Sequence, residues 1–281
     1  MSIRRVGKRG QYMNRQEIGH IIATRLEAAH DDLAFQFRKE GCVPSCVIDD
    51  LLPSHLAQEI HAAFPPHGRM TFKNTLREKK YISAQMNEHP SILEETVFAF
   101  QQHNVVCAVA SITGLMALEP DINLYAGGIS AMPQGNYLKP HLDNSHDGKQ
   151  EKYRALNLLY YTSPDWQEEF GGNLELWDNG PRGIPRTIVS RFNRLAIMAT
   201  NRTSWHSVST VLADKTRCCV SNYYFTPITP DHDDYFHATS FRGRPGEVIG
   251  DLVMQADNAL RTTILKATGT RLYKNPHVYK R

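Results

Sequence analysis

Between residues 137 and 225 the chain is a succession of short segments separated by turn signals. Gly171-Gly172 and the stretch NGPRGIP at 179–185 are typical turn sequences. The segments between the turns are rich in β-branched and aromatic side chains, which favour strands. Many short strands with turns roughly every 8–12 residues predict a β-sandwich or a jelly roll.

The segments that we expect to form strands follow one another along this part of the chain. They are residues 155–162, 173–178, 187–190, 194–200, 204–208 and 217–225. Helices are expected elsewhere: residues 17–40 and 92–118 carry the apolar pattern of helices, and 251–268 reads as an amphipathic helix. Residues 46–65 read as a strand followed by a helix.

His141 and Asp143 are separated by one residue, at the end of a segment that alternates between apolar and polar side chains. On a strand, two such residues point to the same face. Two imidazoles and one carboxylate can hold Fe(II) on one side and leave the other side open for substrate and oxygen. His206 comes from a different expected strand and is the candidate for the second imidazole. Two facing sheets would bring the three side chains around one cavity.

The H-x-D pattern occurs three times in this chain of 13 histidines, so the pattern alone is a weak signal. His30-x-Asp32 falls in the expected helix, where residues two apart point in different directions and cannot share a metal. His232-x-Asp234 lies among prolines and aspartates, which is typical of a solvated loop. The context therefore favours the pair at 141 and 143.

From about residue 43 to residue 228 the chain resembles the Fe(II)/2-oxoglutarate-dependent oxygenases, specifically their prolyl-hydroxylase-like branch. The segments that carry the resemblance are YLKPHLDNS, FGGNLELWD, NRLAIMATNRTSWHSVS and RCCVSNYYFTP, preceded by CVIDDLLPSHLAQEIHAAFP. The resemblance implies a mainly β fold with flanking helices and a double-stranded β-helix core of the jelly-roll or cupin type. It also implies Fe(II) as the metal, 2-oxoglutarate as the cosubstrate and O2 as the oxidant.

The same resemblance assigns roles to individual residues. His141, Asp143 and His206 become the iron ligands, and thereby the catalytic residues. Arg217, which opens the strand after His206, takes the place of the basic residue that binds the distal carboxylate of 2-oxoglutarate. A guanidinium suits that carboxylate because it can donate two parallel hydrogen bonds.

Tyr161 and Asn157 lie four residues apart on one expected strand and share a face of it. By the resemblance, both are candidates for lining the cosubstrate pocket. Other interpretations of the site residues stay open at this point. Tyr161 suits an ordinary core position, and Arg217 suits a surface ion pair. His206 beside Trp205 suits a packed core residue.

Asp143 also bears on the type of reaction. In the related halogenases this position holds a small residue that leaves room for chloride, whereas an aspartate fills it here. The resemblance therefore implies hydroxylation of an unactivated C–H bond, with release of succinate and CO2. The expected substrate is a small metabolite or an amino-acid-like or peptidyl molecule. The absence of a recognisable tandem peptide-binding segment slightly favours a metabolite.

We expect one oxygenase domain, residues 43–232, between two extensions. Residues 1–42 are a basic and helical N-terminal extension, and residues 233–281 are a C-terminal helical extension packed on the core. The amphipathic helix in the latter is also a candidate homodimer contact.

Composition limits the remaining options. A net charge of +3 is too small to argue for a nucleic-acid partner, and no run of 18 apolar residues indicates a membrane span. The basic start of the chain has no apolar stretch of the kind found in signal peptides. The five cysteines form no C-x-x-C pattern, so a cytoplasmic protein is expected.

Two interpretations from other classes compete with an oxygenase. The first is a non-catalytic jelly-roll binding module with a vestigial metal site, against which the complete triad and Arg217 argue. The second is a metal-dependent hydrolase or isomerase on a cupin-like barrel, which would need no cation for a dicarboxylate.

Overall fold

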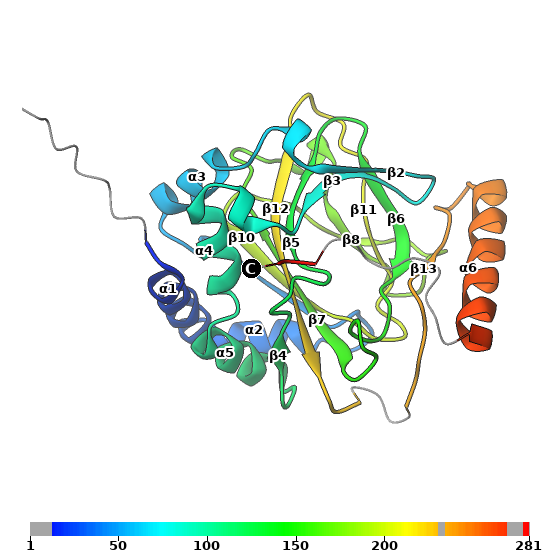
Figure 1. Ribbon diagram of the computed structural model, residues 1–281, viewed down its shortest axis with the longest axis horizontal. Coiled ribbons are helices and arrows are strands. Elements are labelled where there is room, and N and C mark those ends of the chain that lie inside the picture. The colour runs from blue at the N-terminus through cyan, green and yellow to red at the C-terminus, as the bar shows by residue number, and fades with distance from the viewer. Residues whose placement is uncertain (1–12, 230–233, 269–277, 281) are drawn as a thin grey trace, which may run out of the picture.

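The computed structural model describes residues 13–229, 234–268 and 278–280. Its centre is a curled antiparallel sheet of thirteen strands, in the spatial order β1-β10-β7-β12-β5-β3-β6-β11-β8-β9 with three strands off this path. Figure 1 shows this sheet with five helices gathered on one side and α6 alone on the other. The basic start of the chain and His232 lie outside the described residues.

The strands fall into two halves and a set at the margins. The first half comprises β1 (Ser45–Ile48), β10 (Arg194–Ala199), β7 (Tyr153–Tyr161), β12 (Arg217–Thr226), β5 (Gly128–Met132) and β3 (Glu78–Ser83). The second half comprises β6 (Tyr137–Leu142), β11 (His206–Val208), β8 (Leu174–Leu176) and β9 (Arg186–Ile188). The marginal strands are β2 (Thr71–Asn74) beside β3, β4 (Glu119–Pro120) beside β12, and β13 (Ser240–Phe241) beside β6.

Strand β3 joins the two halves. Its residues 81–83 pair with β5, whereas residues 78–79 pair with β6. One strand thus belongs to both halves and joins them into one curled sheet. The result is the double-stranded β-helix core with flanking helices that the sequence predicts.

The two faces of the first half bury different side chains. The face of β12 that carries Val220 and Tyr224 packs with Leu158 and Tyr160 of β7 in the cluster that also contains the helices. The opposite face carries a second cluster around Leu159, Tyr161, Leu174, Met198 and Cys219, which lies between the two halves of the sheet. Side chains that alternate along one strand therefore serve either the helical core or the interior of the barrel.

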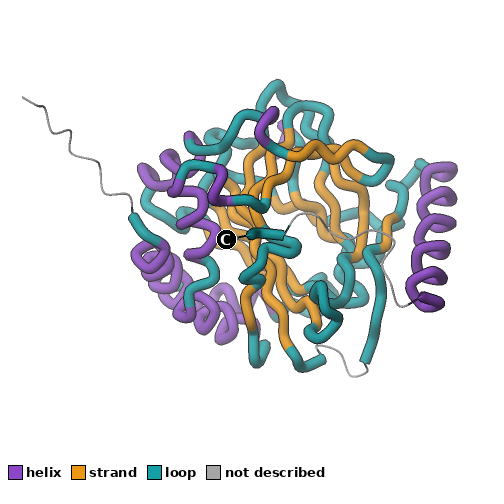
Figure 2. Tube along the Cα trace, in the orientation of Figure 1, coloured by secondary structure: helices purple, strands orange, loops and turns teal. Residues whose placement is uncertain are grey.

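Helices, drawn in purple in Figure 2, cover the outer face of the first half of the sheet. They are α1 (Arg15–Ala28), α2 (His30–Phe37), α3 (Ser54–Ala62), α4 (Ser91–Ala99) and α5 (His103–Thr113). Short 3₁₀ turns are η1 (His67–Arg69), η2 (Met86–Glu88) and η3 (Glu168–Phe170). The sixth helix, α6 (Val248–Thr268), contacts β13. Within the described ranges, no helix combines the length and the apolar character needed to cross a membrane.

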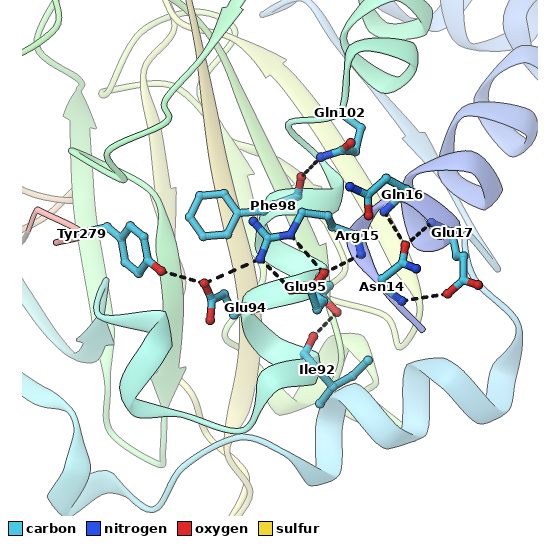
Figure 3. Close-up of polar contacts among 11 residues, drawn as sticks. Asn14, Arg15, Gln16, Glu17, Ile92, Glu94, Glu95, Phe98, Gln102 and Tyr279 are labelled. Atoms are coloured by element: carbon cyan, nitrogen blue, oxygen red, sulfur yellow. Dashed lines mark hydrogen bonds and ion pairs between the residues drawn. The ribbon is translucent and has the colours of Figure 1, made fainter. Parts of the chain in front are cut away.

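Polar contacts fix both ends of the described chain to α4 (Figure 3). Asn14 caps α1 by accepting a hydrogen bond from the Glu17 amide, and the Glu17 carboxylate accepts one from the Asn14 amide. Arg15 donates two side-chain hydrogen bonds to Glu95, at 3.0 and 2.6 Å. Near the other end, the Tyr279 hydroxyl donates to Glu94 at 2.6 Å. Helix α4 thus connects the first helix and the C-terminal segment to the same core.

Two expected long helices are each divided in the structure. Residues 17–40 form α1 and α2, which are separated at Ala29. The segment 92–118 contains most of α4 and all of α5, and α5 ends at Thr113, just before Gly114, whose φ of 73° is left-handed. Such a C-terminal glycine is a common helix stop, so the expected extension to residue 118 was wrong.

Candidate metal centre

Three potential metal ligands meet where β6 and β11 lie side by side. His141 of β6 and His206 of β11 are direct cross-strand partners, and Asp143 follows the end of β6. The ligand atoms of the three residues all lie within 4.8 Å of one another. The Nε2 atom of His141 is 3.6 Å from Oδ1 of Asp143, and that of His206 is 3.8 Å from Oδ2. The structure thus brings together the three residues of the expected triad.

Backbone carbonyls orient both imidazole rings. Nδ1 of His141 lies 3.0 Å from the carbonyl oxygen of Lys139, and Nδ1 of His206 lies 2.9 Å from that of Ser204. A carbonyl can only accept, so each Nδ1 carries a proton, and in the neutral form of each ring Nε2 has its lone pair available for a metal. Phe241 of β13 stacks on the His141 ring, with a centroid distance of 5.1 Å and an interplanar angle of 15°.

The charge states suit a divalent metal. Burial, reinforced by His141, lowers the pKa of His206 to about 4, so its imidazole is neutral near pH 7. Burial alone would raise the pKa of Asp143, but Arg154 and the two histidines hold it well below its usual range. Asp143 Oδ2 is buried and accepts no hydrogen bond within the described chain. A neutral His206 imidazole and an ionised Asp143 carboxylate are in the charge states that Fe(II) ligands require.

Arg154 is a site residue that the sequence did not reveal. Its Nη1 lies 3.2 Å from Oδ2 of Asp143, and its side chain is only 4% exposed. Its guanidinium lies over the Tyr223 ring, 4.5 Å from the centroid. Strand alternation would direct Arg154 toward the helices, like Leu156. A bulge in the pairing of β7 with β12 shifts the register at this point and turns Arg154 to the inner face.

A pocket of about 230 Å³ opens onto the three candidate ligands. Arg217 of β12 lines it and is buried, with 3% of its surface exposed. Its polar contacts are Ser190 Oγ at 3.3 Å and the sulfur of Met132 at 3.7 Å. Among the residues that the structure describes, no carboxylate pairs with Arg217. A buried cation without an anion is costly, so this position is suited to an acidic ligand.

Asn157 and Tyr161, the two other candidates for the cosubstrate pocket, differ in their positions. Asn157 lines the pocket, where its amide donates to the Tyr223 hydroxyl at 3.1 Å and its Oδ1 has no partner within the described chain. Tyr161 lies behind the pocket wall, and its ring covers the Arg217 guanidinium at 4.8 Å. Burial raises the pKa of Tyr161 to about 12, so its hydroxyl stays protonated.

The competing H-x-D pair lies far from this arrangement. His30 is on α2, where its ring nitrogens contact Asp31 and Ser111 at 2.9 and 3.0 Å. Asp32 is exposed on the same helix. Neither residue lines the pocket of the triad.

Comparisons with known proteins agree with this geometry. Residues 127–225 match the model of the 2OG-Fe(II) oxygenase superfamily, where 2OG denotes 2-oxoglutarate. The mouse (Mus musculus) prolyl 3-hydroxylase OGFOD1 is 30% identical over 96 residues, which are 32% of this chain and 17% of that protein. Its Xenopus laevis counterpart is 38% identical over 84 residues, 28% of this chain and 16% of that protein. The chain therefore matches only about a sixth of the length of these relatives.

Solved structures share the fold at low identity. A Pseudomonas putida prolyl-4-hydroxylase has a TM-score of 0.53 at 17% identity, covering 72% of this chain and 98% of that one. A Phytophthora capsici prolyl 4-hydroxylase has a TM-score of 0.55 at 14% identity, covering 93% and 82%. The epimerase SnoN from nogalamycin biosynthesis has a TM-score of 0.51 at 14% identity, covering 90% and 96%.

Fold, site geometry and family match agree on one class: over residues 127–225 the chain is similar to the 2OG-Fe(II) oxygenase superfamily, and its triad lies in that region. Within that superfamily, its sequence is similar to part of two prolyl 3-hydroxylases, and its fold is similar to that of two solved prolyl 4-hydroxylases. Its cofactors are accordingly Fe(II) and 2-oxoglutarate, with O2 as the oxidant.

Proposed function

We propose that this protein is a 2-oxoglutarate-dependent dioxygenase. It hydroxylates an unactivated C–H bond of a small metabolite, or of an amino-acid-like or peptidyl substrate. The proposal depends on one pocket that contains both the His-Asp-His cluster and a buried arginine that has no acidic partner among the described residues. A hydrolase on the same barrel would need the metal ligands but not this arginine.

His141, Asp143 and His206 would hold Fe(II) in this enzyme. Bound Fe(II) and 2-oxoglutarate together supply the oxidant from O2, with release of succinate and CO2. The ionised Asp143 offsets part of the metal charge, and Arg154 keeps that carboxylate ionised and oriented. The carbonyl contacts hold Nδ1 of both imidazoles, so Nε2 is the atom that each ring would present to the metal. His206 is neutral near pH 7, so metal binding does not require its prior deprotonation.

Arg217 would bind the distal carboxylate of 2-oxoglutarate. Its guanidinium already lies in the pocket wall, and the Tyr161 ring holds it in place from behind. Asn157 offers on the same wall an amide oxygen that accepts no hydrogen bond from the described part of the chain. The leucine side chains at 159 and 174 and the valine at 208 give the pocket apolar walls, which limit the access of water to the reacting groups.

The relatives support both substrate classes. The curated relatives are named prolyl 3-hydroxylases, which supports a peptidyl or proline-like substrate. The similar fold of an enzyme from nogalamycin biosynthesis supports a metabolite, and its title names an epimerase. A product heavier than the substrate by one oxygen atom separates hydroxylation from epimerisation.

The decisive test combines cosubstrate binding with a substrate screen. The anaerobic protein loaded with Fe(II) should give the charge-transfer absorption of iron-bound 2-oxoglutarate. Metabolites and peptides are then screened for succinate release above the rate without substrate, and products are weighed by mass spectrometry. Fe(II) binding without charge transfer and without succinate release would reject the proposal and favour a silent binding module.

A further inference from the structure

The hairpin of β2 and β3 brings two lysines opposite each other at the pocket. Lys73 of β2 and Lys80 of β3 are direct cross-strand partners, and both line the pocket of the triad. Like charges at directly opposed positions destabilise a strand pair. This arrangement therefore requires a compensating negative charge on the same face of the hairpin.

The described residues of the hairpin supply only part of that negative charge. Lys80 Nζ lies 2.9 Å from Glu78 Oε2, and both side chains are largely covered, at 22% and 24% exposure. Lys80 holds the pKa of Glu78 below its usual range against the effect of burial, so Glu78 is ionised. Lys73 has no ion pair or hydrogen bond within the part of the chain that the structure describes. Glu78 also interacts electrostatically with Lys73, so among the described residues of this hairpin face one carboxylate serves two lysines and one net positive charge remains.

The two lysines are distinct from the expected cosubstrate anchor. Arg217 enters the pocket from β12, whereas the lysines enter from the hairpin on the other side of β5. Asp143, the acidic residue in the pocket wall, is already paired with Arg154. The pocket thus contains two separate cationic positions, of which one suffices for the distal carboxylate of 2-oxoglutarate.

We propose that Lys73 and Lys80 form a subsite for an anionic group of the substrate, a carboxylate or a phosphate. The subsite rests on the proposed function, because it lies in the same pocket as the iron ligands. A substrate anchored there would be held by its anion while a C–H bond some distance along the molecule faces the iron. Neutral analogues of the same shape would leave Lys73 unpaired and bind more weakly.

The anion subsite can be tested without knowing the substrate. Mn(II) replaces Fe(II), unbound metal is removed, and N-oxalylglycine saturates the 2-oxoglutarate position. Inorganic phosphate and ¹³C-labelled acetate are then titrated separately, and paramagnetic broadening of their ³¹P and ¹³C lines reports binding near the metal. The probe that binds more tightly identifies phosphate or carboxylate as the preferred group.

Matched substitutions on one hairpin distinguish the subsite from general surface charge. Lys73→Gln and Lys80→Gln should weaken binding of the tighter probe about tenfold or more, since a hydrogen bond to a charged group contributes about 1.5–3 kcal/mol. Lys79→Gln removes the same charge from the strand face that does not line the pocket, and it should leave binding nearly unchanged.

Each negative outcome has a separate meaning. Absence of broadening in the wild-type protein, or equal broadening in all three variants, overturns the anion subsite. Failure of N-oxalylglycine or Mn(II) to bind in the wild-type protein would instead contradict the proposed oxygenase function. Circular dichroism of each variant verifies that the hairpin substitution leaves the protein folded.

Discussion

At the scale of single residues, the candidate ligands are identified by their tautomers as much as by their proximity. His206 presents Nε2 to Asp143 because Nδ1 is bound to the Ser204 carbonyl. We expect His206→Ala to bind Fe(II) more weakly under anaerobic conditions. The loss of affinity should exceed the roughly 10–100-fold caused by losing a residue that only orients a metal ligand. Metal analysis after desalting measures this loss. His30→Ala is the control and should retain iron; full retention in His206→Ala would refute the ligand assignment.

Arg217 provides the second residue-scale prediction. Removing a charge-assisted partner from a buried carboxylate costs about 2–5 kcal/mol, a loss of tens- to thousands-fold in affinity. Arg217→Ala should therefore raise the KM for 2-oxoglutarate by such a factor while iron content stays at the wild-type level. If KM is unchanged and activity intact, the anchor lies elsewhere in the pocket, and Lys80 is the next cation to substitute.

Arg154 acts on iron through Asp143 and is therefore a positioning residue. Arg154→Gln leaves the Asp143 carboxylate without its nearest cation, so we expect Fe(II) affinity to fall about 10–100-fold. Arg154→Lys keeps a positive charge and should recover a large part of that affinity. An iron affinity equal to wild type in Arg154→Gln, measured by competition with a chelator, would show that this contact does not tune the metal.

At the scale of secondary-structure elements, strand alternation explains which site residues the sequence could reveal. His141 and Asp143 share a face by spacing alone, and the alternation from Arg217 to Tyr223 places both on the pocket wall. Arg154 was not predicted, because the bulge in β7 turns its side chain to the opposite face of the strand. The apolar pattern of a single sequence does not show where such a bulge lies. The pairing of β3 with both halves of the sheet was equally invisible, since it depends on contacts distant in the chain.

The turn before β8 gives an element-scale prediction. Gly171 has φ 68° and ψ −158°, a region essentially restricted to glycine, and an added Cβ would lie 2.0 Å from the Thr210 carbonyl oxygen. Gly171→Ala should therefore destabilise the protein by clearly more than the roughly 1–2 kcal/mol of left-handed strain alone. Gly180→Ala is the matched control, because its φ is +78° but nothing lies within 4 Å of the added Cβ. Similar urea midpoints for both variants would contradict this account.

At the scale of the whole molecule, one sheet separates two interiors with different requirements. The outer face of β7 and β12 joins the helices in an apolar core. The inner face encloses histidines, arginines and Asp143 in the pocket and around it. Alternate residues of the same strands thus contribute either to the stability of the fold or to the chemistry of the pocket. Substitutions on the inner face should change metal and ligand binding more than global stability, whereas those on the outer face should do the reverse.

Burial of histidines also sets how the whole molecule responds to acid. The histidines whose pKa values burial lowers are His61, His89, His146, His206 and His237. A group with a folded-state pKa below its unfolded value stabilises the protein above the unfolded pKa. That contribution is lost as pH falls toward the folded pKa, because the unfolded chain binds the proton first. For His206, this stability is lost over the pH range from its ordinary pKa of 6.5 down to its folded-state pKa of about 4.

The metal-free protein should therefore lose stability between pH 7 and pH 5, a range above the ordinary pKa values of carboxylates. His206 alone accounts for about 2 kcal/mol of this loss, since one pKa unit corresponds to about 1.4 kcal/mol. Urea unfolding of the chelator-treated protein at several pH values measures the slope, and His206→Asn should make it shallower. Loading with Fe(II) should steepen it, because protons then compete with the metal for both imidazoles. An unfolding free energy that is flat over this range would show that the buried histidines are already protonated or accessible in the folded protein.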